Sequence, residues 1–265
     1  MIKRLSSLAA RLGFENQEAM LDFCLRIDEF YYTKIDLKRK GIGWKARILN
    51  PSKGTLKLVQ KKISKLLHEI EMPQYVQGSR KGRGSVSNAR LHQGNKEFFV
   101  TDLKDFFPSI NNRRVYEAFA ASGFSPDVSR VLTTFTTFRG KVPQGAPTSS
   151  GVANLCFLEI DSRLSSIANA YGITYTRYVD DLVFSSPRAF IDLSQTIISV
   201  VAAGGFKVSR KKTHYKRGPM VVTGAIVRNN GLAITPKTQK KLNCGLISEK
   251  SKRGLLAYKK QVETA

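Results

Sequence analysis

The feature of this chain that most constrains its fold is a pair of adjacent acids, Asp180 and Asp181, between two apolar stretches at residues 173–175 and 182–184. Neighbouring side chains of an extended strand point to opposite faces, so consecutive acids between apolar runs fit best at the tight turn of a β-hairpin. The sequence therefore predicts a hairpin over residues 174–185 with both carboxylates at its exposed tip. Taken alone, an Asp-Asp pair is more often a plain solvated turn.

A third candidate acid, Asp102, ends the apolar run that begins at Phe98. Three carboxylates at the ends of two strands can hold two divalent cations about 4 Å apart, the arrangement that clamps the attacking and leaving oxygens in phosphoryl transfer. Mg²⁺ suits such a site because it takes oxygen ligands and keeps waters and substrate phosphates in its shell. The pattern predicts two Mg²⁺ ions held by Asp102, Asp180 and Asp181.

Four segments, in this order, resemble the motifs of reverse transcriptases. Residues 102–110 (Asp-Leu-Lys-Asp-Phe-Phe-Pro-Ser-Ile) resemble the first metal-binding motif of that family. Residues 142–150 (Val-Pro-Gln-Gly-Ala-Pro-Thr-Ser-Ser) resemble the Pro-Gln-Gly loop that supports the incoming nucleotide and template. Residues 178–181 (Tyr-Val-Asp-Asp) resemble the Tyr-x-Asp-Asp box, and residues 205–213 are similar to the lysine-bearing motif that follows it. Four motifs in the family's order are a specific signal.

Two further strings narrow the resemblance to retron reverse transcriptases. Asn-Ala-Arg-Leu-His at residues 88–92 resembles the Asn-Ala-x-x-His element of retron enzymes, and Val-Thr-Gly at residues 222–224 resembles their Val-Thr-Gly triplet near the end of the palm. Each string is short and weak alone. They stand on either side of the catalytic motifs, as they do in retrons, and therefore favour that branch.

The resemblance implies roles for residues near the three acids. The acids would be the catalytic metal ligands, with the main-chain carbonyl of Leu103 as a further oxygen ligand. Lys212 would donate a proton to the departing pyrophosphate, a role for which Lys207 and Lys211 are competing candidates.

The resemblance also implies nucleotide contacts in the first motif. Phe107 would stack under the sugar and exclude a 2′ hydroxyl; the alternative is a core phenylalanine beside Phe106. Asp105 would position the nucleotide through its backbone amide, or instead cap the turn before Pro108.

Further nucleotide contacts are expected outside that motif. Gln144 would offer its amide to the sugar-phosphate, and Gly145 would let the backbone approach closely. Residues 45–51 resemble the fingers hairpin, in which Lys45 or Arg47 would meet the nucleotide triphosphate. The alternative for both cations is a solvated basic surface.

The charge balance points to a nucleic-acid partner. The chain has 44 Lys and Arg against 20 Asp and Glu, a formal charge of +24 and a pI of about 10.2, well into the range expected of nucleic-acid binding. Counterion release then gives affinity for any polyanion without specificity. The glycine-rich basic loop 78–85 is expected to wrap a phosphate backbone, or to be a plain mobile loop. The RNA-binding candidates are Arg80, Lys81, Arg83, Asn88, His92, Lys237, Lys240 and Lys241, with palm packing as the alternative for the segment 88–92.

Cysteine spacing and hydropathy indicate the cellular compartment in which the protein is expected. Cys24, Cys156 and Cys244 are widely spaced, so neither a zinc site nor a disulfide framework is indicated. The apolar residues of the basic segment 1–12 are broken by charge before a signal-peptide core can form. No run approaches the roughly 18 apolar residues of a membrane span. We therefore expect a cytoplasmic protein without a membrane partner.

The order of the expected elements predicts an α+β fold. Strands at 97–102, 206–208 and 221–227 join the hairpin, and helices are expected at 113–121, 149–167 and 190–203. This succession suits a palm of split βαβ type, an antiparallel sheet packed on helices. By resemblance the fold is a right-hand polymerase. Its expected parts are a helical N-terminus and fingers at 1–96, a palm at 97–230, and a short basic helical thumb or tail at 231–265.

The resemblance implies an RNA-directed DNA polymerase of retron type that uses dNTPs. Such an enzyme binds a cognate structured noncoding RNA, primes from a 2′ hydroxyl of a guanosine in it, and yields a branched RNA–DNA hybrid. An anti-phage role with an accessory effector protein is also implied. The alternatives are a group II intron-like or other defence-associated reverse transcriptase, and a catalytically inactive basic RNA-binding scaffold. The intact three acids argue against the scaffold, since a pure binder has no physical need for an acidic cluster in so basic a surface.

Overall fold

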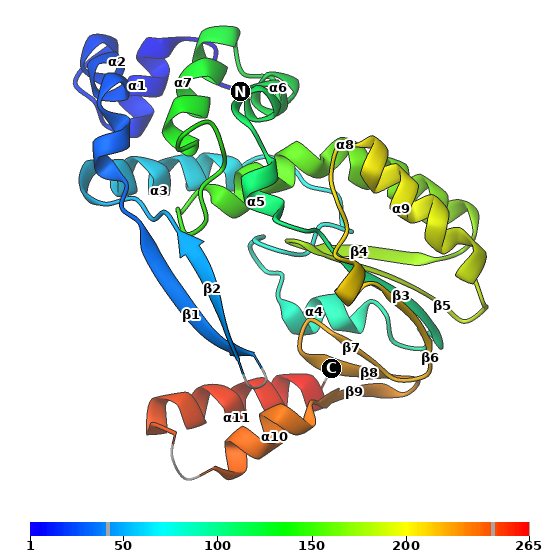
Figure 1. The fold of residues 1–265 in the computed structure, drawn as a ribbon. Coiled ribbons are helices and arrows are strands. Elements are labelled where there is room, and N and C mark those ends of the chain that lie inside the picture. Colours follow the sequence, from blue (N-terminus) through cyan, green and yellow to red (C-terminus); the bar gives the residue numbers. More distant parts are fainter. Residues whose placement is uncertain (41–42, 245–246, 265) are drawn as a thin grey trace. The chain divides into compact units, whose positions relative to one another are not determined.

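The computed structural model describes residues 1–40, 43–244 and 247–264 (Figure 1). The chain folds into two compact units, each made from two stretches of sequence. Unit 1 comprises Met1–Glu71 and Asp105–Leu158, and unit 2 comprises Met72–Lys104 and Glu159–Ala265.

Unit 1 is mainly helical and carries one two-stranded antiparallel ribbon (Figure 1). Its helical elements are α1 (Leu5–Leu12), α2 (Gln17–Leu25), η1 (Ile27–Phe30), α3 (Gly54–His68), α5 (Phe106–Ser109), α6 (Asn112–Ala121), α7 (Pro126–Thr136) and the first part of α8 (Ser149–Ala170). The ribbon pairs β1 (Lys34–Lys40) with β2 (Gly43–Leu49). Most of the first thirty residues are thus helical, and the ribbon precedes the basic helix α3.

A fully buried glutamine, Gln60 of α3, links separate segments of unit 1. Its Nε2 donates to the Tyr31 hydroxyl at 2.7 Å and to the Phe135 carbonyl at 2.8 Å, while its Oε1 accepts from Ser52 Oγ at 2.6 Å. Buried polar groups are tolerated when they are hydrogen-bonded. Gln60 therefore ties α3 to α7 and to the segments that flank the ribbon.

Unit 2 contains two antiparallel sheets. The first has the strand order β4-β5-β3-β6, and the second the order β7-β8-β9. The strands are β3 (Glu97–Asp102), β4 (Thr174–Tyr178), β5 (Asp181–Ser186), β6 (His214–Arg217), β7 (Met220–Val222), β8 (Ala225–Arg228) and β9 (Gly231–Ile234). The helical elements are the rest of α8 with α4 (Ser85–Arg90), η2 (Ile191–Leu193), α9 (Ser194–Ala203), η3 (Arg210–Lys212), α10 (Pro236–Asn243) and α11 (Glu249–Glu263). This mixture confirms the α+β class.

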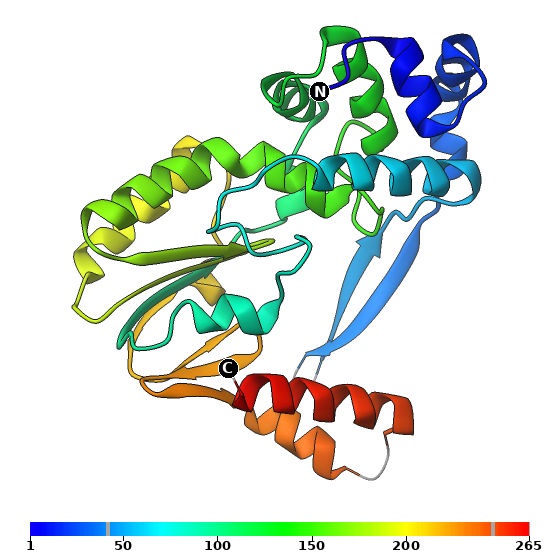
Figure 2. The ribbon, with the colours of Figure 1, turned by 180° about the vertical axis from the view of Figure 1, so that it is seen from behind.

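The first sheet is covered on both faces. Side chains alternate along a strand, so Tyr175 and Arg177 of β4 share one face, and both contact Asp161 of α8. Helices α8 and α9 lie on that side of the sheet (Figures 1 and 2). Phe98 and Val183 point to the other face and join a buried cluster with α4, the second sheet and Val262 of α11. The strand and helix order thus gives a palm-like layer with an interior on each side.

Two predicted strands differ from the structure. Residues 206–208 form no strand; Val208 makes only an isolated bridge to Leu103, and the fourth strand of the sheet begins later, at His214. The segment 221–227 is two strands, because Thr223 and Gly224 adopt positive φ values of 44° and 92° and reverse the chain. A positive φ at consecutive residues marks a turn and cannot continue a strand.

Among the helices that the structure describes, none combines the length and the apolar character needed to cross a membrane.

Candidate active site

The predicted hairpin turn is present, and it is tight. Tyr178 pairs with Asp181 across β4 and β5, which leaves Val179 and Asp180 as the two-residue loop. Val179 has φ +61°. Both favoured two-residue hairpin turns need a positive φ at this position, where glycine, asparagine or aspartate is usual. A β-branched residue there is a conformational outlier, so the surrounding structure must hold the turn.

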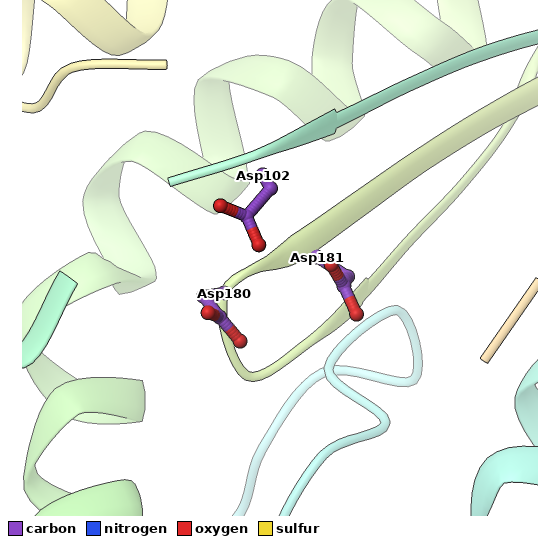
Figure 3. Close-up of side chains that lie close together, drawn as sticks. All are labelled: Asp102, Asp180 and Asp181. Carbon is purple, nitrogen blue, oxygen red and sulfur yellow. The ribbon is translucent and has the colours of Figure 1, made fainter. Parts of the chain in front are cut away.

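The three acids lie together at the end of the sheet, as the sequence predicts (Figure 3). Asp102 at the end of β3 lies opposite Asp181 at the start of β5, and Asp180 is in the turn. One carboxylate oxygen of each residue lies within 4.8 Å of the others. Asp102 is buried, with 7% of its surface exposed, while Asp180 and Asp181 are half-buried.

Backbone hydrogen bonds fix the strand end that carries Asp102. The Leu103 amide donates to the Asp180 carbonyl at 2.8 Å, which joins β3 to the turn. The Ser209 amide donates to the Asp102 carbonyl at 2.7 Å, and the Lys104 amide donates to the Lys207 carbonyl at 2.7 Å. The positions of the acids therefore follow from main-chain pairing.

Lys212 is the cation that the structure brings to the acids. Its ammonium contacts Asp102 Oδ2 in an ion pair. Partial burial lowers the pKa of Lys212, but the hydrogen bond to Asp102 and the charges of the acids outweigh it, so the net shift is upward. Lys207 and Lys211, the competing candidates, are exposed as Lys212 is, so the contact with Asp102 is what distinguishes Lys212. A lysine protonated at neutral pH is suited to donate a proton.

Asp181 is the acid with the most perturbed ionisation. Burial, followed by the charges of Asp180 and Asp102, raises its pKa from 3.8 to about 7, although Lys212 acts in the opposite direction. Like charges held close together disfavour a further ionised carboxylate. The cluster therefore carries excess negative charge that a divalent cation would relieve.

The donor set fits a hard divalent cation. All three side chains offer carboxylate oxygens, the ligands that Mg²⁺ prefers, and Asp180 and Asp181 are partly exposed to solvent. The Leu103 carbonyl stays a predicted ligand. The residues that would hold a divalent cation are thus close together.

The nucleotide candidates of the first motif lie in unit 1. Phe106 is buried and packs edge-on against Phe157 with ring centroids 5.7 Å apart, whereas Phe107 is half-buried. Phe106 is therefore the core residue of this pair. Asp105 is exposed in a left-handed conformation with φ +50°, and its side chain makes no cap hydrogen bond to α5.

The other nucleotide candidates also lie in unit 1. The Gln144 carbonyl accepts from the Asn50 amide at 2.8 Å, and Gly145 has φ +97°, a conformation that favours glycine. Arg47 is exposed on β2, opposite Asp36. Lys45 belongs to β2 by its backbone, and its side chain lies outside the described part of the chain.

Two RNA candidates, Asn88 and His92, are fully buried. His92 Nδ1 and Ser185 Oγ are 2.6 Å apart, and His92 Nε2 and Thr176 Oγ1 are 2.7 Å apart, so the ring joins both strands of the catalytic hairpin. Burial lowers its pKa to about 3, which keeps it neutral. Asn88 Nδ2 donates to Thr223 Oγ1 at 3.4 Å. The expected direct RNA contact is not available to these buried side chains, and the packing alternative is the one this geometry supports.

The remaining RNA candidates differ in availability. Arg80 is half-buried and donates through Nη1 to the carbonyls of Pro73 at 2.7 Å and Val76 at 3.1 Å. Exposed side chains are found at Lys81, Arg83, Lys237, Lys240 and Lys241. The exposed cations are suited to phosphate contacts, whereas Arg80 also holds its own loop.

Sequence reasoning missed one buried ion pair next to the site, between Arg177 and Asp161. A signal was present in one of the two segments, because an arginine stands inside the apolar hairpin stretch 173–184. Charged residues are almost never fully buried unless paired. The arginine therefore indicated a buried acidic partner, whereas the helix 149–170 also carries Glu159 and Arg163 and does not single out Asp161.

The antiparallel sheet, its hairpin and the carboxylate cluster at the turn define the palm of a right-hand nucleic-acid polymerase. Residues 38–244 match the family described as "Reverse transcriptase (RNA-dependent DNA polymerase)". The chain belongs to the reverse transcriptase family.

Curated relatives confirm the resemblance to retron enzymes. The chain is 35% identical to the Retron Se72 reverse transcriptase of Salmonella heidelberg (strain 579083-10) over 71% of its length and 49% of the relative's. It is 28% identical to the Retron Ec86 reverse transcriptase of Escherichia coli, over 95% and 82% of the two chains. It is 32% identical to the Retron Mx162 reverse transcriptase of Myxococcus xanthus, over 76% of this chain and 50% of the relative. The chain thus spans about half the length of the Salmonella and Myxococcus relatives.

Solved structures support the fold. An apo telomerase from Candida Tropicalis superposes with a TM-score of 0.56 at 13% identity, over 87% of this chain and 51% of that one. A telomerase from Candida albicans, solved with a fragment of telomeric RNA, superposes with a TM-score of 0.55 at 11% identity, over 79% and 48% of the two chains. At such low identity the likeness concerns the fold alone.

Proposed function

We propose that the protein is an RNA-directed DNA polymerase of retron type. The observation that carries the proposal is the cluster of Asp102, Asp180 and Asp181 at the hairpin turn, with oxygens within 4.8 Å of one another. When bound there, two Mg²⁺ ions supply charge compensation for the attacking and leaving oxygens of nucleotidyl transfer. Lys212 stands beside Asp102 as the proton donor to the pyrophosphate.

By the same resemblance, residues of unit 1 bind and orient the nucleotide. Phe107 excludes a 2′ hydroxyl, Asp105, Gln144 and Gly145 support the dNTP, and Lys45 or Arg47 meets its triphosphate. The net charge of +24 holds template and product through their phosphates. Exposed Lys81 and Arg83 serve this purpose in the loop 78–84, as do Lys237, Lys240 and Lys241 in α10.

The substrate and partner follow from the retron resemblance. The template is a cognate structured noncoding RNA, the primer is a 2′ hydroxyl of a guanosine in that RNA, and the product is a branched RNA–DNA hybrid. The biological role is anti-phage defence in the cytoplasm, together with an accessory effector protein. The relatives named above support this proposal because each is itself named a retron reverse transcriptase.

Sequencing of the nucleic acid that co-purifies with the protein tests the proposal. A DNA strand joined through a 2′–5′ branch to one RNA species is the expected result, and a debranching enzyme should release the two strands. Linear cDNA primed from a 3′ hydroxyl would instead identify an intron-like enzyme. RNA without any DNA, in a preparation that also fails to incorporate dNTPs, would identify a scaffold.

A further inference from the structure

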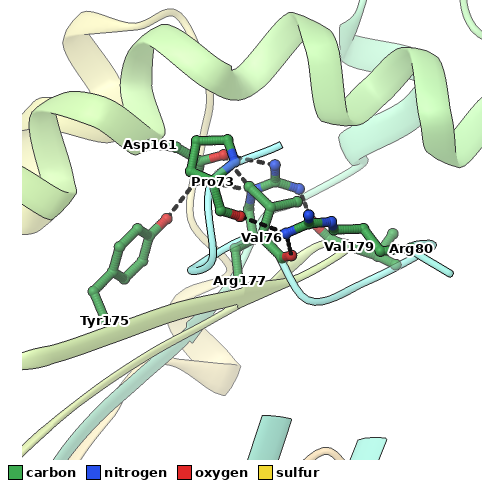
Figure 4. A network of polar contacts seen from close by, with 7 residues as sticks. All are labelled: Pro73, Val76, Arg80, Asp161, Tyr175, Arg177 and Val179. Carbon is green, nitrogen blue, oxygen red and sulfur yellow. Dashed lines mark hydrogen bonds and ion pairs between the residues drawn. The ribbon is translucent and has the colours of Figure 1, made fainter. Parts of the chain in front are cut away.

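The feature that carries a further inference is the buried ion pair between Arg177 of β4 and Asp161 of α8, whose side chains are both 0% exposed. Arg177 Nε lies 2.9 Å from Asp161 Oδ1, and Nη2 lies 2.6 Å from Oδ2. The Tyr175 hydroxyl donates to Oδ1 at 2.6 Å. The carboxylate is therefore held by a two-pronged contact with the guanidinium and by one further donor (Figure 4).

The third nitrogen of Arg177 reaches the catalytic turn. Arg177 Nη1 donates to the Val179 carbonyl at 3.0 Å (Figure 4). Val179 is the turn residue with φ +61°, and its carbonyl belongs to the peptide that leads into Asp180. One planar guanidinium thus connects a buried anchor on α8 to the strained position of the hairpin.

Arg177 makes this contact from the face of the sheet opposite to the side chains of Asp102 and Asp181. Arg177 pairs with Leu182 across the hairpin, whereas Asp181 pairs with Tyr178 on one side and with Asp102 on the other. Because side chains alternate along a strand, Arg177 lies on the face covered by α8, and Asp102 and Asp181 lie on the opposite face. Arg177 can therefore hold the turn without occupying the space where substrate and cations would bind.

The backbone of residues 75–78 holds the same strand from outside. The amides of Gln77 and Gly78 donate to the Arg177 carbonyl at 2.8 and 3.4 Å, and the Arg177 amide donates to the Tyr75 carbonyl at 2.8 Å. A Cβ atom on Gly78 would lie 2.5 Å from the Val179 amide nitrogen. This segment therefore presses directly on the turn and leaves no space there for a side chain.

We propose that Arg177, anchored by Asp161, and the segment 75–78 are positioning elements that fix the Val179 turn and thereby the spacing of Asp180 and Asp181 from Asp102. The inference rests on the proposed function in taking these acids as cation ligands. Arg177 touches neither substrate nor cation and acts through the turn. Its loss should therefore impair cation binding in molecules that remain folded.

The first test compares wild type with Arg177→Lys. Lysine keeps the positive charge beside Asp161, but a single ammonium cannot hold the carboxylate in two places and also reach the Val179 carbonyl. Mn²⁺ binding is followed by electron paramagnetic resonance, nucleotide incorporation is measured against Mg²⁺ concentration, and thermal unfolding gives the folded fraction. We expect the Mn²⁺ affinity of the folded variant to fall about tenfold or more, as is typical when support of a metal ligand is lost.

A matched pair of glycine variants tests the turn from its other side. Gly78→Ala introduces a methyl group against the Val179 amide, whereas Gly84→Ala adds one in the same loop where nothing lies within 4 Å. Gly84 has φ −157°, an extended conformation that alanine adopts freely. Gly78→Ala should weaken Mn²⁺ binding and raise the Mg²⁺ requirement, and Gly84→Ala should change neither. This pair decides the question if Arg177→Lys does not fold.

The outcomes separate the inference from the proposed function. The inference is overturned if folded Arg177→Lys and folded Gly78→Ala bind Mn²⁺ as wild type does and keep its Mg²⁺ dependence. In that case the ion pair between Arg177 and Asp161 contributes to stability alone. It is also overturned if wild type binds no Mn²⁺ at the acids, with Asp180→Asn as the reference. It stands if the variants lose Mn²⁺ affinity even though no protein incorporates dNTPs, a result that removes only the proposed function.

Discussion

Lys212 of η3 forms an ion pair with Asp102 at the end of β3. The cation that balances this carboxylate is thus the residue best placed to protonate a leaving pyrophosphate. Lys212→Gln should lower the rate of nucleotide incorporation by about 10²–10⁴-fold, the usual contribution of a general acid. Lys211→Gln is the matched control, since Lys211 is an exposed neighbour in the same element. Single-turnover rates with saturating dNTP measure the effect, and a larger loss for Lys211→Gln would move the donor to that residue.

Asp180→Asn should abolish DNA synthesis and leave RNA binding nearly intact. The substitution removes one ligand from the cluster, but it changes a formal charge of +24 by only one unit. Primer extension and filter binding measure the two properties on the same preparation. Asp192→Asn, in the exposed η2 segment, is the control and should keep both. Extension at the wild-type rate by Asp180→Asn would rule out the two-cation mechanism.

Phe107→Ala should raise ribonucleotide incorporation relative to deoxyribonucleotide incorporation. Its half-buried ring is available to contact a sugar, whereas Phe106 packs on Phe157 in the core. Phe106→Ala should instead lower the free energy of unfolding by about 3–5 kcal/mol, the usual cost of truncating a core phenylalanine. Competition between ATP and dATP, together with denaturant unfolding, separates the two effects. If they occur at the opposite residues, the assignment within this motif is shifted by one position.

The pKa of about 7 at Asp181 predicts a pH-dependent stability of the metal-free protein. Folded protein holds a proton on Asp181 that the unfolded chain has already released, so this contribution to stability is present at low pH and is lost as pH rises through about 7. In EDTA, wild type should lose stability relative to Asp181→Asn between about pH 4 and pH 7, measured by denaturant unfolding. Saturating Mn²⁺ should remove the difference in slope. Parallel profiles in EDTA would contradict the shifted pKa.

RNA affinity should depend on the exposed cations and not on buried His92. Neutralising Lys81 and Arg83 should weaken all RNAs alike and reduce the salt slope by about 0.7–0.9 per charge removed. Neutralising Lys237, Lys240 and Lys241 should selectively weaken the cognate RNA. His92→Gln should leave the RNA affinity of the folded fraction unchanged, because His92 is 0% exposed. Competition binding at several salt concentrations decides between these classes; a cognate-specific loss in folded His92→Gln would restore a recognition role for that element.

The hairpin and its acids could be predicted from the sequence because their signal is local. Apolar stretches at residues 173–175 and 182–184 flank the adjacent acids, and a two-residue turn between the strands leaves few choices for the chain. Strand β3 was predicted with its observed bounds, since Glu97 and Asp102 mark the ends of a continuous apolar run. The contact between the two elements came from the resemblance to a known family.

Elements that depend on distant partners could not be predicted. The strand at His214–Arg217 has an exposed and basic sequence, and it is a strand only because β3 offers it a free edge. Asn88 and His92 were expected to contact RNA, with palm packing as the alternative, because their segment resembles a retron element. Their burial is stabilised by hydroxyl partners at Thr223, Ser185 and Thr176, far away in the sequence. Likewise Arg177 gives no local indication that its partner is Asp161.

The strand that carries Asp102 has paired neighbours on both sides, β5 and β6. Internal strands open to solvent last, whereas edges and loops open at little cost in free energy. We therefore expect the amides of the strand that carries the first acid to exchange slowly, although the turn that completes the site is a two-residue loop. Heating should then abolish the polymerase activity in two steps, of which the first is reversible and the second is not. If the turn alone becomes disordered, activity is lost while the sheet stays folded, and activity returns on cooling. If β3 also unfolds, the site has no folded sheet on which to form again.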